Sequence, residues 1–190
     1  FEGTTDYGEM LICDGANKPF FFKMTGTGAL SDRTFFAGEI TVDSTTAPTV
    51  GVIHENHFVV GGAPTAKNKI FFSATLDPES FSGTGSGSIQ LTDAIVGLAS
   101  FRSDLIIFCK NSIFKLINIS DSSNIAIVPI TQNVGCLDGN SIQEIGGDLL
   151  FLSPDGIRTV AGTARIGDVE LSSVSRQIQK ITTTIANGIN

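Results

Sequence analysis

The chain is poor in charged residues, in tryptophan and in tyrosine. Its 190 residues include no tryptophan, one tyrosine (Tyr7) and only 16% charged residues. Soluble domains typically carry about 25% charged residues. Sugar-binding platforms favour Trp and Tyr rings, so their scarcity argues against such a platform. The low charge density suits a protein whose surface is partly covered by partners, and an ordinary β domain with a plain surface is the alternative.

Basic residues are too few and too scattered for a nucleic-acid binder. The 12 Lys and Arg residues are outnumbered by 19 Asp and Glu residues, and the formal net charge is −7. The basic residues are spread from Lys18 to Lys180 and form no run. Proteins that grip phosphates or read base sequence need a basic footprint. The sequence therefore argues against that class of function.

The three cysteines do not match a metal-binding or redox pattern. Cys13, Cys109 and Cys136 have neither zinc-site spacing nor a CxxC arrangement, and an odd number leaves at least one unpaired. Cys13 and Cys109 follow hydrophobic runs, so we expect both to be small buried hydrophobic residues. This usage indicates a reducing compartment, or a particle assembled in one.

Long apolar runs and targeting signals are also missing. No stretch reaches the length of a membrane span, so we expect no membrane-spanning segment. The sequence opens with Phe1-Glu2-Gly3, without an initiator Met or a signal-like segment. We therefore interpret the chain as a processed product or as one piece of a longer polypeptide.

What the sequence does have is a repeated pair of hydrophobic strands. The leading strands of the four pairs start at residues 10, 58, 105 and 149, so the steps are 48, 47 and 44 residues. The pairs are 10–13 with 20–23, 58–60 with 70–73, 105–108 with 112–116, and 149–152 with 156–160. A period of about 40–50 residues built of strands is typical of propeller blades. We predict an all-β fold with about four blade-like repeats, part of a larger β-propeller.

Turn residues and shorter β segments complete the predicted repeats. Breaks are expected at Asp14-Gly15 with Pro19, at Gly61–Pro64, at Lys110-Asn111 and at Ser153–Gly156. Further strands are expected at 35–42, 51–53, 88–91 and 125–130, and one short C-terminal helix at 174–181. No linker divides the chain, so residues 1–190 are predicted to form a single propeller region.

The one histidine cluster is predicted to be structural. His54 and His57 are three residues apart with Glu55 between them, a spacing that on a helix would offer two metal ligands. The segment leads into a strand, where residues three apart point to opposite faces. No third ligand is apparent, so we predict no metal site, no cofactor and a structural histidine pair.

No catalytic arrangement is apparent either. The acids Asp14, Asp77, Asp138 and Asp155 stand beside Gly or Pro or in other turn contexts, and turn formation explains them. Ser73, Ser112 and Ser153 lie in strand–turn contexts and not in a Gly-x-Ser-x-Gly elbow. Asp104 and Asp148 each immediately precede a leading strand, which fits a repeated turn. We therefore predict that the protein is not an enzyme and has no catalytic residues.

The order of motifs in the repeats resembles a known family. The relevant segments are His54–Gly62, Asn68–Ser73, Asp77–Phe81, Asp93–Leu98, Asp104–Leu116, Gly135-Cys136, Ser141-Ile142 and Gly146–Ile157. Together they resemble the propeller region of bacteriophage tail nozzle and packaged-DNA-stabilisation proteins, the tail-tube proteins of short-tailed phages. The resemblance covers roughly residues 50 to 175, whereas residues 1–49 match only as a generic blade. Proteins of that family are several times longer than this chain.

The resemblance implies a virion structural protein at the head–tail junction or tail tip. Such proteins form rings, usually sixfold, with other tail, adaptor and portal proteins as neighbours, and they are assembled in the host cytoplasm. DNA passes through the ring without specific binding, and the ring retains the genome until infection. An acidic chain is compatible with that role, because a basic wall would hold the duplex.

Two other readings stay open from the sequence. One is a carbohydrate-binding or glycan-cleaving propeller, which needs exposed aromatic rings or two carboxylates across a cleft. The other is a protein-interaction propeller of cellular origin, although the WD and kelch signatures are missing.

Overall fold

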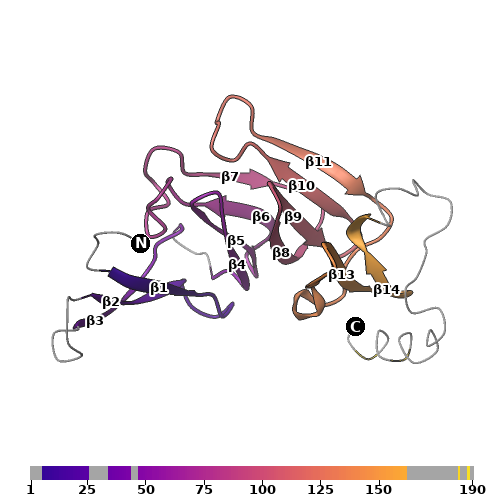
Figure 1. Cartoon of the computed structure of the whole chain (residues 1–190), viewed down its shortest axis with the longest axis horizontal. Helices are drawn as coiled ribbons and strands as arrows, with labels where there is room; N and C mark the ends of the chain where they lie inside the picture. The colour runs from indigo at the N-terminus through magenta and orange to yellow at the C-terminus, as the bar shows by residue number, and fades with distance from the viewer. Residues whose placement is uncertain (1–5, 26–33, 44–46, 162–183, 185–187, 189–190) are drawn as a thin grey trace.

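All the sheets of the protein are antiparallel, and it contains almost no helix, where the computed structural model describes it (Figure 1), at residues 6–25, 34–43 and 47–161 and at the single positions 184 and 188. The first sheet contains β1 (Asp6–Ile12), β2 (Phe20–Thr25) and β3 (Thr34–Glu39). The second contains β4 (Val50–His54), β5 (His57–Ala63), β6 (Ala66–Phe72) and β7 (Gly87–Gln90). The third contains β8 (Ile95–Phe101), β9 (Asp104–Cys109), β10 (Ile113–Ile117) and β11 (Ala126–Thr131). The fourth contains β12 (Gln143–Ile145), β13 (Asp148–Ser153) and β14 (Gly156–Thr159), preceded by the short 3-10 helix η2 (Gly139–Ser141).

The predicted strand pairs are confirmed as hairpins, one in each sheet. They are β1–β2, β5–β6, β9–β10 and β13–β14, and every sheet is a meander in which consecutive strands are neighbours. The shorter predicted segments are β3, β4, β7 and β11. The all-β prediction is therefore confirmed, while the described residues do not close into a ring of sheets.

Two strands, β8 and β12, were not predicted as strands. In β8, Gly97, Ala99 and Ser100 interrupt the hydrophobic alternation. Gly97 leaves room for η2, because a Cβ atom there would lie 3.1 Å from Gly139 Cα, whereas Ser100 contacts His54. In β12 all three residues are exposed, so no apolar pattern marks it.

One predicted turn is misplaced. The segment Gly61–Pro64 was expected to break the second pair, yet β5 continues to Ala63 and only Pro64 and Thr65 form the turn. The register shifts between Gly61 and Ala63, and Gly62 has a φ of 71°. Glycine permits this left-handed bulge inside the strand, so the strand bends without ending. The predicted helix at 174–181 lies outside the described residues.

The core consists of the faces between successive sheets, and β5 and β9 are apolar on both sides. Phe58 and Val60 of β5 pack towards the first sheet, and Val59 between them packs towards the third. In β9, Leu105 and Ile107 face the second sheet. Each such side chain contributes about 1.5–3 kcal/mol by burial. Because strand neighbours alternate in direction, one hydrophobic run fills two interfaces.

The interface between the third and fourth sheets is built in the same way. Ile106 and Phe108, the alternate residues of β9, form a cluster with Leu149 and Phe151 of β13. The rings of Phe108 and Phe151 lie 5.3 Å apart and are tilted. β5 and β9 thus each join their own sheet to both neighbours.

Each chain segment that leads into a sheet is fastened to the hairpin of that sheet. Thr49 N donates to Gly61 O (3.1 Å), Lys110 N to Ala94 O (2.9 Å) and Leu137 N to Leu152 O (2.9 Å). Two of these segments, those that lead into the second and fourth sheets, also bond to the preceding hairpin, through Gly15 N to Pro48 O (3.0 Å) and Cys136 N to Cys109 O (2.9 Å). This recurrence shows that the connections between successive sheets are similar.

The residue that follows the last strand of each of the first two sheets identifies which strands of these sheets correspond. Ile40 follows β3 and donates its amide to Pro19 O (2.6 Å), and Leu91 follows β7 and donates its amide to Asn68 O (2.7 Å). Both side chains are buried. β3 therefore corresponds to β7, and counting back makes β1 the counterpart of β5. Among the described residues, the first sheet has no counterpart of β4, β8 and β12, the first strands of the other three sheets.

Candidate functional site: a cavity at the inner strand edges

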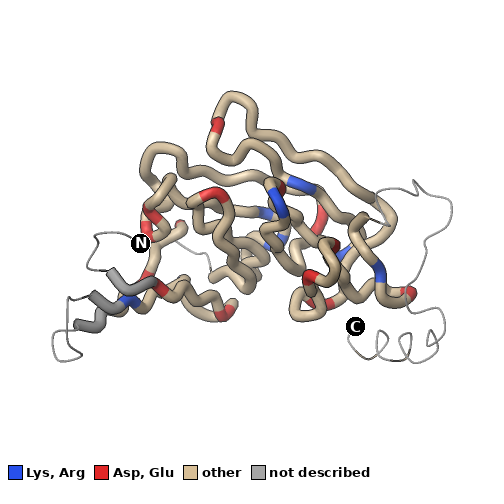
Figure 2. Tube along the Cα trace, viewed as in Figure 1, with Lys and Arg blue, Asp and Glu red and all other residues tan. Residues whose placement is uncertain are grey.

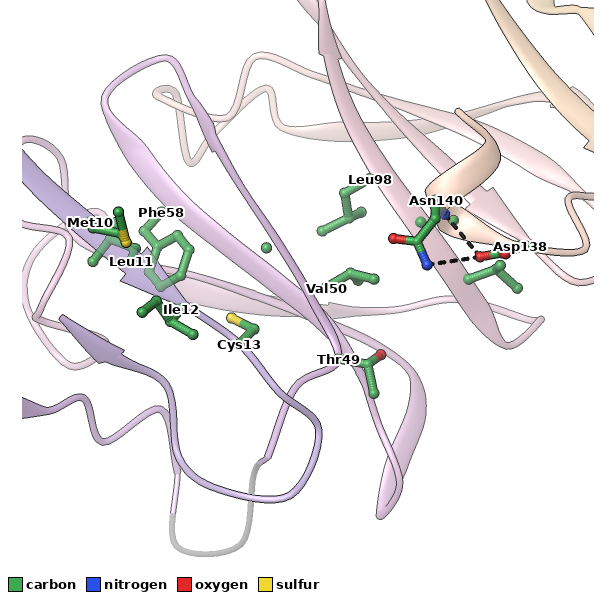
Figure 3. Close-up of a pocket in the computed structure, with 14 residues that line it drawn as sticks. Met10, Leu11, Ile12, Cys13, Thr49, Val50, Phe58, Leu98, Asp138 and Asn140 are labelled. Atoms are coloured by element: carbon green, nitrogen blue, oxygen red, sulfur yellow. Dashed lines mark hydrogen bonds between the residues drawn. The ribbon is translucent and has the colours of Figure 1, made fainter. Parts of the chain in front are cut away.

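A cavity of about 590 Å³ lies where the inner edges of the sheets meet (Figure 3). Its walls come from the end of β1 at 10–13, the start of β4 at 49–51, β8 at 96–98 and the segment 138–140. Phe58 of β5 closes the wall between the first two sheets. The volume lies in the range of ordinary ligand sites, about 300–1,000 Å³.

The polar groups of the cavity are mostly engaged in local structure. Asp138 accepts hydrogen bonds from the backbone N (2.9 Å) and Nδ2 (3.1 Å) of Asn140, and so caps η2. Thr49 Oγ1 donates to Gly62 O (3.1 Å). Among the described residues of the lining, Asp138 is the one carboxylate, and there is no Lys, Arg or His. Apart from Thr49, Asp138 and Asn140, the lining residues are apolar in type or glycine.

The thiol of Cys13, in the cavity wall, has low reactivity. Burial, together with the neighbouring Asp14 carboxylate, raises the pKa of Cys13 to about 12. The thiolate is the reactive form, so Cys13 is a poor nucleophile near neutral pH. Cys13 is partly buried, whereas Cys109 and Cys136 are fully buried, and all three are free thiols. The prediction of a small buried residue is confirmed for Cys109.

Glycine permits the close approach of the first two sheets beside this thiol. A Cβ atom at Gly51 would lie 2.9 Å from Phe58 Cε2 and 3.0 Å from Cys13 Sγ. Both distances are shorter than normal carbon contacts, so a side chain at Gly51 would push β4 and β1 apart.

The predicted orientation of the histidines is wrong. His54 ends β4 and His57 begins β5, and they face each other across a turn formed by Glu55 (φ 44°) and Asn56 (φ 63°). Because they belong to two strands and pair directly, they share one face of the sheet. The left-handed turn was not recognised in the sequence because it contains no glycine.

Both histidines are buried between the second and third sheets. His54 Nδ1 lies 2.8 Å from Ser100 Oγ of β8. His57 Nδ1 donates to the carbonyl oxygen of Ser73 (2.6 Å), and its Nε2 lies 3.4 Å from Ser120 Oγ, in the loop between β10 and β11. Burial lowers the pKa of His54 from 6.5 because it disfavours the imidazolium. The described residues include no group of three or more His, Cys, Asp or Glu able to hold a metal ion.

The predicted turn roles are confirmed for three of the acids. Asp14 accepts from the backbone amides of Ala16 (2.9 Å) and Asn17 (2.8 Å), and Asp138 caps η2. Asp155 lies in the turn between β13 and β14, where it accepts from Ser153 Oγ (2.8 Å) and also pairs with the buried side chain of Arg158. Asp148 accepts from Leu149 N (2.8 Å) at the start of β13.

The sequence did not reveal the role of Asp93. Its carboxylate accepts from Asn111 N (2.6 Å), Ala94 N (2.8 Å) and Ser112 Oγ (2.9 Å), and thereby fixes the β9–β10 hairpin to the segment that leads into β8. Asp93 lies just before β8, and this position would have indicated its role if β8 had been predicted as a strand.

Charged groups do not gather on the described chain, as Figure 2 shows for the basic and acidic positions. One ion pair links sheets: Lys23 Nζ of β2 lies 2.6 Å from Glu79 Oε1, in the loop between β6 and β7. No helix in the described part of the chain has the length and apolarity needed to cross a membrane.

Comparisons with known proteins give no family. No family model and no curated protein matches the chain. Among solved structures, the chain is similar to one described as the crystal structure of HIRA(644–1017), with a TM-score of 0.36 and 10% identity over 98% of this chain and 72% of that one. A similarity at that level supports no conclusion about fold or function.

Proposed function

We propose that this chain is a region of a β-propeller and acts as a structural protein of a short-tailed phage tail or neck. The observation that carries the propeller is the single cavity onto which β1, β4, β8 and the segment before β12 all open. In a propeller, the inner edge of each blade faces a common axis. The similar connections between successive sheets support the same arrangement.

The phage assignment rests on the order of motifs between residues 50 and 175, which resembles the nozzle and packaged-DNA-stabilisation proteins. The proposed role is assembly, in which copies form a ring, most simply sixfold, around a channel for DNA. The scattered charges and the net charge of −7 suit a wall that does not hold the duplex. In the virion the ring contacts other tail, adaptor and portal proteins.

The glycan alternative is less well supported by the cavity. Phe58 is the one aromatic residue in the lining and is only 2% exposed, so it offers no stacking platform. Glycoside hydrolysis uses two carboxylates about 5–10 Å apart. The lining supplies only Asp138.

Electron microscopy and native mass spectrometry of the full-length protein test this proposal. We expect rings with a central channel, and second, third and fourth sheets related by successive rotations about one axis through the cavity. Antibodies against the purified chain should label the tail or neck of the phage that encodes it. A full-length protein that stays monomeric and is absent from virions would refute the phage role. Sheets that do not share an axis would refute the propeller.

A further inference from the structure

The first sheet is open at the edge where its neighbours have an inner strand. In the second sheet β4 pairs with β5, and in the third β8 pairs with β9. β1 is the counterpart of β5, and among the described strands it pairs only with β2. An open strand edge offers unpaired amide and carbonyl groups, and proteins normally cover such an edge.

The cavity lies beside that open edge. Met10, Leu11 and Ile12 of β1, with Cys13 directly after it, form one wall, and β4 and β8 form the walls on the other sides (Figure 3). The empty space next to β1 is therefore enclosed in the same way as the space next to β5, which β4 occupies. Met10 is 61% exposed on this wall, although it is a large apolar residue.

We propose that the edge of β1 at Met10–Cys13 is a docking site for an extended strand donated by another polypeptide chain. The strand adds to the first sheet antiparallel to β1 and fills the cavity. Backbone hydrogen bonds to β1 supply affinity, and alternate side chains contact the apolar wall. The site depends on the order of strands alone and is independent of the phage assignment.

The lining defines the chemistry of the donated strand. Apolar residues of the wall, such as Val50, Val96 and Leu98, favour a β-branched side chain at every second position. β4 starts opposite the C-terminal end of β5, so the added strand starts opposite Ile12 and Cys13. Asp138 directly precedes η2 and therefore lies before β12, the first strand of its own sheet. The described residues that line the cavity include no Lys, Arg or His. A basic residue at the start of the donated strand would therefore be complementary.

The described chain has no spare strand for this position. Each of its strands already belongs to one of the four sheets. A partner chain is therefore the proposed donor, while a second copy of this chain and a segment of the same chain are the outcomes that the test must separate.

Peptide binding to the purified chain tests the site. The probe is a fluorescent peptide Lys-Val-Thr-Val-Ser-Val-Thr, followed by anisotropy. We expect saturable binding with a dissociation constant of about 10–500 µM. The same peptide with its central Val replaced by Pro should bind at least about tenfold more weakly, because Pro removes a donor from the ladder. Replacing its Lys by Glu should also weaken binding, and this difference should disappear in Asp138→Asn.

Two matched variants locate the peptide. Met10→Lys changes an exposed residue of the cavity wall and should weaken binding at least about fivefold, since it adds a cation beside a cationic, apolar peptide. Ile145→Lys changes a residue of similar exposure (59%) outside the cavity and should leave binding unchanged. Amide hydrogen exchange at residues 10–13 should slow when the peptide binds.

Several results would overturn the proposal. These are no saturable binding, equal binding by Met10→Lys and the unmodified protein, or exchange protection elsewhere than in β1. Protection, without peptide, of those amides of residues 10–13 that point away from β2 would also overturn it. If that protection grew with protein concentration, a second copy would be the occupant. If it persisted in a monomer, the occupant would be a segment of the same chain.

Discussion

His57 donates a hydrogen bond from Nδ1 to the backbone oxygen of Ser73, 2.6 Å away, and so ties the start of β5 to the end of β6. A carbonyl oxygen can only accept, so Nδ1 carries the proton in this contact. The ring is fully buried and lies edge-on to Phe72, with 6.0 Å between ring centres. The imidazole thus supports the hairpin that forms the centre of the second sheet.

Replacing this ring should weaken the fold without affecting a reaction. His57→Ala leaves the Ser73 oxygen without its donor and opens a cavity beside Phe72, so we expect a loss of about 2–4 kcal/mol in the free energy of unfolding. Urea denaturation measures it. Lys67→Ala, at an exposed position, is the control and should change stability by less than about 0.5 kcal/mol. Equal stability of the two variants would contradict a structural role for His57.

Stability should fall at mildly acidic pH because of His54. The pKa of this residue is lower in the folded state than its ordinary 6.5, so the unfolded chain binds a proton more readily. The stabilisation is complete above pH 6.5 and is lost as the pH falls through the folded pKa. Urea midpoints between about pH 5 and pH 8 measure this loss. In His54→Gln the loss should be smaller, and an identical pH profile would show that His54 is not responsible.

The cysteines should react in a fixed order with a thiol reagent. Burial raises the pKa of all three thiols, to about 12 for Cys13 and Cys109, but only Cys13 lies in a cavity wall and is partly exposed. The folded protein should therefore label slowly, and first at Cys13. Labelling in denaturant should modify all three. A Cys13→Ser variant that labels as fast as the unmodified protein would contradict this order.

Gly135 should be intolerant of any side chain. A Cβ atom there would collide with the backbone at Lys110 and Asn111, which cannot move without disturbing the β9–β10 hairpin. We expect Gly135→Ala to lower stability by about 2–4 kcal/mol. Gly146→Ala is the matched control. Its Cβ would meet nothing within 4 Å, so only its φ of 62° disfavours alanine, by about 1 kcal/mol. If both variants lost the same stability in urea, close contact at Gly135 would not be the cause.

The central hairpins could be predicted from the sequence because their strands are buried on both sides. A run such as Leu105–Phe108 is apolar without interruption, since alternate residues serve two different interfaces. β8 and β12 carry no comparable signal. β8 has Gly97 where η2 packs on it, and β12 is exposed.

The cavity could not be predicted, because four segments far apart in the sequence form it. None of the stretches around Met10, Thr49, Val96 and Asp138 has a recognisable motif of its own. The histidine turn was missed for a different reason. Glu55 and Asn56 adopt left-handed conformations that the sequence usually assigns to glycine. Only the pairing of β4 with β5 places His54 opposite His57.

The meander order of every sheet also has a consequence for synthesis on the ribosome. All strand pairings are between consecutive strands, so each sheet can form as soon as its own residues have emerged. A newly formed sheet remains prone to non-specific association, however, because β5 and β9 each keep one apolar face exposed until the following sheet has formed. We expect ribosome-bound chains that end after β7 to need chaperone protection, and chains that extend beyond β11 to resist proteolysis within the second sheet.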